Sequence, residues 1–118
     1  MALCVFGDVR SIVDTDLTDA EITNLITWID ARIKIRIDTG SAPSGLTAAE
    51  WAAFLEGLSA TWTAYRCMLK DPESEALGEY RGDRSAALKA LKEEIKDMLS
   101  AGGGGIAMQY HSESLPRW

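Results

Sequence analysis

Two copies of one helix-start pattern constrain the fold of this chain more than any other feature of its sequence. Thr18-Asp-Ala-Glu21 and Thr47-Ala-Ala-Glu50 each place a hydroxyl three residues before a carboxylate, directly ahead of a run with apolar residues at helical spacing. In such a capping box, the two side chains bind backbone N–H groups that the first turn of a helix leaves without partners. The two boxes therefore predict two long helices in the first seventy residues.

The first of these predicted helices continues to about Thr39, where Gly40 stops it. Trp28 and Ile35 widen its apolar face. Residues 33–37 also alternate as a strand would, but the helical stripe runs unbroken through them, so we predict helix. The stripe consists of Ile22, Leu25, Ile26, Ile29, Ile33 and Ile37.

The second predicted helix runs to about Lys70. It ends there because Asp71 precedes Pro72, and the residue before a proline avoids helical angles. Small residues on its other faces allow neighbouring helices to approach it from more than one side. Its inner face consists of Trp51, Phe54, Leu55, Leu58, Trp62, Tyr65 and Leu69.

Two further helices flank this pair. Residues 8–14 predict a helix of two turns with Asp8 as its cap. A polar loop is expected at 73–82, and a charged amphipathic helix at 83–101. We therefore predict an all-α fold, in which a short N-terminal helix precedes three longer, mostly antiparallel helices.

The chain after the last predicted helix has its own character. We divide the sequence into a helical domain at 1–101, a glycine hinge at 102–105 and an extended C-terminal docking tail at 106–118. Ordering the tail backbone costs more free energy than burying its apolar side chains returns, so the tail needs a partner surface or stays a frayed end. We predict that it docks onto a neighbouring protein. The predicted contact residues are Ile106, Met108, Tyr110, Leu115 and Trp118.

Composition argues against several classes of function. The formal net charge is −6, whereas a general nucleic-acid binder needs a basic face. Cys4 and Cys67 are far apart and match no metal-ligand spacing, which favours buried free thiols in a reducing compartment. No apolar run approaches the length of a membrane span. We therefore expect a protein of the cytoplasm, or of a particle assembled there.

The residues that carry most enzyme chemistry form no recognisable set. The one histidine, His111, lies in the tail, and no nucleophile can be placed beside it. The run Gly102–Gly105 follows a helix rather than a strand and precedes no lysine, so it is not a phosphate loop. Carboxylates do not cluster at metal-ligand spacings. We expect no enzymatic activity, no catalytic residue, no cofactor and no metal.

Four arginines allow two interpretations. Arg32 and Arg36 are four residues apart and share one helix face, while Arg81 and Arg84 flank the start of the last predicted helix. Such arginines pair with nearby acids of the same chain, or they form salt bridges between subunits that set register and orientation. The sequence leaves both possibilities open.

Several short motifs, spread over residues 8–101, resemble a known family. They are Asp8-Val9-Arg10, the long isoleucine-rich helix that begins at Thr18-Asp-Ala-Glu-Ile22, the Lys70-Asp-Pro-Glu-Ser74 corner and the Leu77-Gly-Glu-Tyr80 loop. Their order is similar to that in the head–tail connector, or adaptor, proteins of tailed phages and related viruses.

This resemblance implies a structural protein of the virion neck, assembled in the host cytoplasm. It implies a ring, expected to be a dodecamer, that lies beneath the portal and lines the channel through which DNA passes without specific binding. The expected partners are the portal protein, neighbouring copies and tail-side completion or tail proteins, with no membrane. The C-terminal extension would reach the portal or an adjacent subunit. The alternative is a small helical regulatory or protein-binding module.

Overall fold

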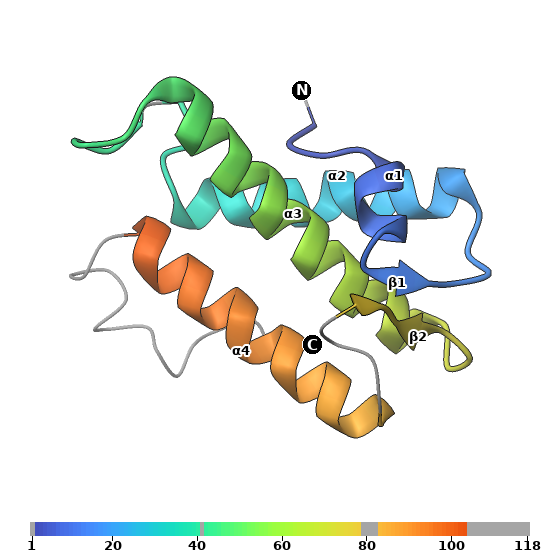
Figure 1. Cartoon of the computed structure of the whole chain (residues 1–118). Helices are drawn as coiled ribbons and strands as arrows, with labels where there is room; N and C mark the ends of the chain where they lie inside the picture. Colours follow the sequence, from blue (N-terminus) through green and yellow to red (C-terminus); the bar gives the residue numbers. More distant parts are fainter. Residues whose placement is uncertain (1, 41, 79–82, 104–118) are drawn as a thin grey trace.

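The computed structural model describes residues 2–40, 42–78 and 83–103. Within these ranges it confirms the predicted all-α class, because a short N-terminal helix is followed by three longer ones and the strands are only two residues each (Figure 1). The elements are α1 (Phe6–Arg10), β1 (Val13–Asp14), α2 (Asp19–Arg36), α3 (Ala48–Lys70), β2 (Glu75–Ala76) and α4 (Arg84–Gly103).

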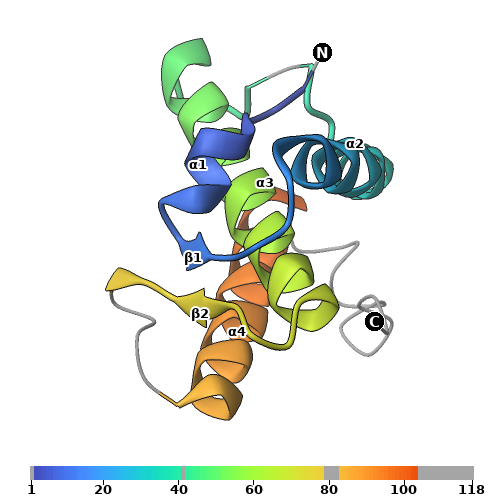
Figure 2. The same ribbon diagram turned by 90° about the vertical axis from the view of Figure 1, so that its right-hand side faces the viewer.

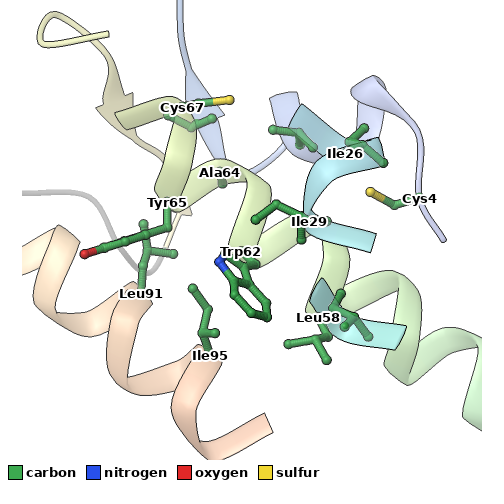
Figure 3. Close-up of a cluster of buried hydrophobic side chains, with 14 of the residues drawn as sticks. Cys4, Ile26, Ile29, Leu58, Trp62, Ala64, Tyr65, Cys67, Leu91 and Ile95 are labelled. Atoms are coloured by element: carbon green, nitrogen blue, oxygen red, sulfur yellow. The ribbon is translucent and has the colours of Figure 1, made fainter. Parts of the chain in front are cut away.

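Helix α3 lies at the centre of the molecule. It runs antiparallel to α4 and crosses α2 on another side, while α1 and the two strands cover a third side (Figures 1 and 2). At the centre, the fully buried Trp62 lies between Ile29 of α2 and Ile95 of α4 (Figure 3). Small buried residues, including Ala60 and Ala64, allow this close approach from several sides, as predicted.

Both capping boxes form as the sequence predicts. The Thr18 hydroxyl accepts a bond from the Glu21 backbone N–H at 3.1 Å, and the Glu21 carboxylate accepts one from the Thr18 N–H at 3.0 Å. Thr47 and Glu50 form the same pair of bonds, at 3.1 and 2.9 Å. These bonds, above all those from the threonine backbone, hold the pKa of both glutamates below the usual value.

Helix α2 is shorter than predicted. It ends at Arg36 rather than at about Thr39, because Ile37 takes extended angles and turns its side chain into the core. The prediction of helix rather than strand is confirmed up to that residue. The prediction that Ile35 widens the buried face is wrong, since its side chain is 81% exposed, and Trp28 is 39% exposed.

The N-terminal segment departs further from the prediction of a helix over 8–14. The helix ends at Arg10, and Val13 and Asp14 instead form β1, which pairs antiparallel with β2 inside the predicted loop at 73–82. Asp8 is not the first cap; it lies inside α1, where its carboxylate accepts the Val5 backbone N–H at 3.0 Å. The sequence did not predict this strand because two residues are too few to show a periodic pattern, and because the paired strand lies about sixty residues further along the chain.

The end of α4 also differs from the predicted domain boundary. The helix continues through Gly103, so Gly102 and Gly103 are helical residues rather than parts of a hinge. Gly104 and Gly105, and the whole tail at 106–118, lie outside the described residues. The docking tail therefore remains a prediction.

Candidate interaction surface

Two guanidinium groups lie over the ring of an exposed tryptophan, Trp28, on α2. The Arg32 Cζ atom lies 3.8 Å from the centroid of the Trp28 ring, and the Cζ of Arg66 from α3 lies 4.7 Å from the same centroid. Both distances are within the range of cation–π attraction. The contact concentrates two positive charges and an indole at one place on the surface of an acidic protein.

The same face of α2 continues toward its C-terminal end. Ile35 and Arg36 follow Trp28 by seven and eight residues, which places them beside Arg32 on a surface that we call the α2 stripe (Trp28, Arg32, Ile35 and Arg36). Partial burial, followed by the charge of Arg32, lowers the pKa of Arg36. Among the residues that the structure describes, neither arginine of the stripe forms an ion pair with a carboxylate.

The α2 stripe has the composition of an interface rather than of an ordinary wet surface. Like charges four residues apart on a helix repel each other, and the Arg32 Nε is buried with no hydrogen-bond partner in the described part of the chain. Tryptophan and arginine are the side chains that contribute most to protein–protein binding, and Ile35 adds an exposed apolar surface. Carboxylates of a partner protein would form ion pairs with the two arginines of the stripe.

The other two arginines considered for salt bridges between subunits have different positions. Arg84 donates to the backbone carbonyls of Met68 and Ser74, the second bond at 3.1 Å. It thus binds the C-terminal end of α3, where the helix dipole favours a cation, and acts within its own subunit. Arg81 lies outside the described residues. The five predicted tail contacts lie outside them as well: Ile106, Met108, Tyr110, Leu115 and Trp118.

A second surface was not visible in the sequence. Asp14 of β1 and Glu75 of β2 are directly opposed in the antiparallel pair, and both are exposed. Opposed like charges destabilise a strand pair, so this position favours an external cation. Exposed Glu73 precedes β2, and we call Asp14, Glu73 and Glu75 the acidic edge. Only the pairing of distant segments brings these carboxylates together.

A hollow of about 660 Å³ adjoins the acidic edge. Its lining includes both glutamates of the edge, the apolar groups of Met68 and Pro72, and Arg84. The Arg84 guanidinium keeps its positive charge while it donates to backbone carbonyls, and the two exposed glutamates outnumber it, so the charged side chains of the lining are negative on balance. The hollow thus combines apolar surface with negative charge.

The described residues offer little for covalent or metal chemistry. No three His, Cys, Asp or Glu side chains within 2–40, 42–78 and 83–103 are grouped as metal ligands. Burial raises the pKa of both Cys4 and Cys67 to about 11, which keeps the thiols protonated and weakly nucleophilic.

The buried carboxylate of Asp30 is used for structure. It accepts bonds from the Leu3 backbone N–H at 2.8 Å and from the Ser59 hydroxyl at 2.6 Å. Ser59 also lies 3.1 Å from the Cys4 sulfur, so this network holds the N-terminal segment against α2 and α3. No helix in the part of the chain that the structure describes is both long and apolar enough to cross a membrane.

The chain was also compared with known proteins. No protein-family model, curated protein or solved structure matches it.

Proposed function

We propose that this chain is a head–tail connector of a tailed virus, a structural protein that forms a ring beneath the portal and lines the DNA channel. The observation that carries the proposal is the α2 stripe. An exposed row of tryptophan, isoleucine and two arginines that bind no carboxylate in the described chain suits repeated contact with other protein subunits. The family resemblance of the motifs supplies the particular kind of assembly.

Two of the motifs that carry the resemblance hold corners of the helical body. Arg10, from Asp8-Val9-Arg10, donates to the Asp19 carboxylate at the start of α2 and to the Leu17 carbonyl. Asp71, from the corner after α3, accepts bonds from the Thr15 hydroxyl and the Asp16 N–H. These residues set how α1, α2 and α3 meet, which supports a connector-like body built from such motifs.

The proposed mechanism is binding without covalent chemistry. Helical faces pack copy against copy, and the tail at 106–118 adds a tethered contact to the portal or to a neighbouring copy. The acidic composition of the chain suits a channel wall, because negative charge repels the phosphate backbone of passing DNA. The tail-side face of the ring would bind completion or tail proteins.

The decisive experiment is native mass spectrometry of the protein alone and after mixing with purified portal rings of the same virus. We expect the portal peak to gain about a dozen copies, in keeping with a closed symmetric ring. Deleting residues 106–118 should abolish this shift while the circular dichroism of the body stays helical. Lys34→Glu, an exposed change in the helical body that leaves the tail intact, is the control and should bind normally.

The contrary result is equally clear. A chain that never co-migrates with portal rings and keeps one fixed mass at every concentration rejects the connector function. Such a result favours the alternative of a small helical regulatory or protein-binding module, in which the α2 stripe serves a single partner protein.

A further inference from the structure

The α2 stripe and the acidic edge lie on different sides of the molecule. In Figure 2, α2 lies on one side of α3, and β1 and β2 lie on the other. Figure 1 likewise places the C-terminal end of α2 away from the two strands. Among the described residues, the arginines of the stripe form no ion pair with the carboxylates of the edge, so these carboxylates are open to the arginines of a second copy.

The two surfaces are complementary in charge. The stripe presents Arg32 and Arg36, which have no carboxylate partner among the described residues. The edge presents Asp14, Glu73 and Glu75, two of which repel each other across the strand pair. Joining the surfaces would relieve both repulsions at once.

They are also complementary in polarity and form. Beside its arginines, the stripe carries two exposed apolar side chains, Ile35 and Trp28. The hollow of about 660 Å³ beside the edge combines the apolar groups of Met68 and Pro72 with the carboxylates of Glu73 and Glu75. Apolar side chains that enter such a hollow, flanked by charge pairs, form the usual arrangement of an interface core and rim.

We propose that the α2 stripe of one copy binds the acidic edge of the next copy, and that this head-to-tail contact is the interface that builds the ring. The inference rests on the proposed function in that it supplies the contact from which a connector ring would form. A contact between two different surfaces of identical chains is heterologous, so it closes into a ring when the rotation between copies divides a full turn.

The test uses two charge-reversed forms of the full chain. Variant A, Arg32→Glu with Arg36→Glu, makes the stripe acidic; variant B, Asp14→Lys with Glu75→Lys, makes the edge basic. Analytical ultracentrifugation over a concentration series should show that each variant alone self-associates at least about 100-fold more weakly than the unchanged chain. In an equal mixture each surface meets an opposite charge on the other variant, so association should return to within about tenfold of the original.

Matched controls reverse the same number of charges on the exposed face of α4. Lys89→Glu with Lys92→Glu corresponds to variant A, and Glu93→Lys with Glu94→Lys corresponds to variant B; both should associate normally. Ile35→Asp provides an independent variant, because a side chain that is 81% exposed can change without disturbing the fold, and it should weaken association about tenfold or more.

The contrary outcomes separate failure of the interface from failure of the connector function. An unchanged chain that stays monomeric at every concentration rejects it, as does a mixture of variants A and B that fails to recover. If variant A keeps its self-association but loses binding to a single-stranded DNA oligonucleotide, the stripe binds nucleic acid instead. If the chain self-associates through these surfaces but does not bind portal rings, the interface stands and the connector function is rejected. If portal binding and the ring both survive the two charge reversals, the connector function stands and the interface is rejected.

Discussion

Gly102 of α4 packs directly against the ring of Phe54 in α3. A Cβ atom on Gly102 would lie 2.8 Å from the Phe54 Cε2 and 3.0 Å from the Cδ1 of Ile37. Real Cβ atoms essentially never come within 2.8 Å of another heavy atom, so the absence of a side chain at Gly102 is what allows the last turn of α4 to reach the junction of α2 and α3. The first glycine of the run is therefore a packing residue.

Gly102→Ala should lower the free energy of unfolding by about 1–2 kcal/mol, because Phe54 or the helix end must shift to admit the methyl group. Urea denaturation measures the change. Gly57→Ala is the matched control, since a Cβ there would meet only the Met98 Cε at 3.6 Å, and alanine favours helix by up to about 1 kcal/mol. Equal stabilisation of both variants would contradict the close packing.

Arg10→Ala should destabilise the protein by roughly 1–3 kcal/mol. Arg10 binds the Asp19 carboxylate through two nitrogens, at 3.1 and 2.8 Å, and also the carbonyls of Thr15 and Leu17. Its loss removes several bonds that hold the chain entering α2. The exposed ion pair of Lys70 with Glu21, whose charged atoms are 4.0 Å apart, provides the comparison.

Lys70→Ala should change stability by less than about 0.5 kcal/mol, because a solvated ion pair contributes little. Thermal denaturation of both variants at one pH gives the contrast. If Arg10→Ala costs no more than Lys70→Ala, the hydrogen bonds of Arg10 do not hold the corner.

Stability should fall in acid partly through Asp71. The bond from the Thr15 hydroxyl, followed by that from the Asp16 N–H, lowers the pKa of Asp71 below its usual 3.8. The unfolded chain then takes up a proton first as the pH falls, so the stabilisation is present above the unfolded pKa and is lost as the pH drops through the lower folded pKa.

Thr15→Val tests the contribution of Asp71 to stability, because it removes the hydroxyl that is the largest cause of the lowered Asp71 pKa. Melting temperatures should be lower than those of the unchanged protein at neutral pH, and the difference should shrink over the range of pH below the ordinary aspartate pKa of 3.8. A difference that stays constant over this range would show that the hydroxyl contributes only to packing.

Both thiols should resist modification in the folded protein. Burial raises the pKa of Cys4 and Cys67 from 9.0 to about 11, which reduces the reactive thiolate about a hundredfold at neutral pH. Reaction with a chromogenic disulfide should therefore follow unfolding, and it should be immediate in urea. Fast labelling of the folded chain would contradict the burial of the thiols.

The same shifts predict a loss of stability in alkali. The unfolded thiols ionise near their ordinary pKa of 9.0 while the folded thiols still hold their protons, so stability decreases as the pH rises from about 9 to about 11. Replacing both cysteines with alanine should flatten this part of the stability profile, which thermal denaturation at several pH values would show.

The sequence predicted the helices well where the signal was local. The boxes at Thr18 and Thr47 each act within four residues, and Asp71 before Pro72 ends α3 where the sequence placed its end. Periodic isoleucines also predicted the buried side of α2, as the burial of Ile22 and Ile33 shows. The sequence could not predict that α2 ends at Arg36, because the end of this helix depends on the burial of Ile37 against the rest of the core.

The candidate surface was only partly predictable. The spacing of Arg32 and Arg36 placed them on one face, but the role of Trp28 depends on Arg66 of another helix. The sequence correctly placed Arg84 at the start of the last helix, but it could not show that Arg84 donates to the carbonyls of Met68 and Ser74 within its own subunit. Such contacts depend on the arrangement of the helices.

By itself, the amino-acid sequence determined the class of fold, because capping and helical periodicity act over a few residues of the chain. Only the tertiary structure decided that Asp14 opposes Glu75 and that Gly102 lies against Phe54. Those pairs are formed by residues far apart in the chain. Their meeting depends on how the whole core packs, and no local pattern of residues encodes that arrangement.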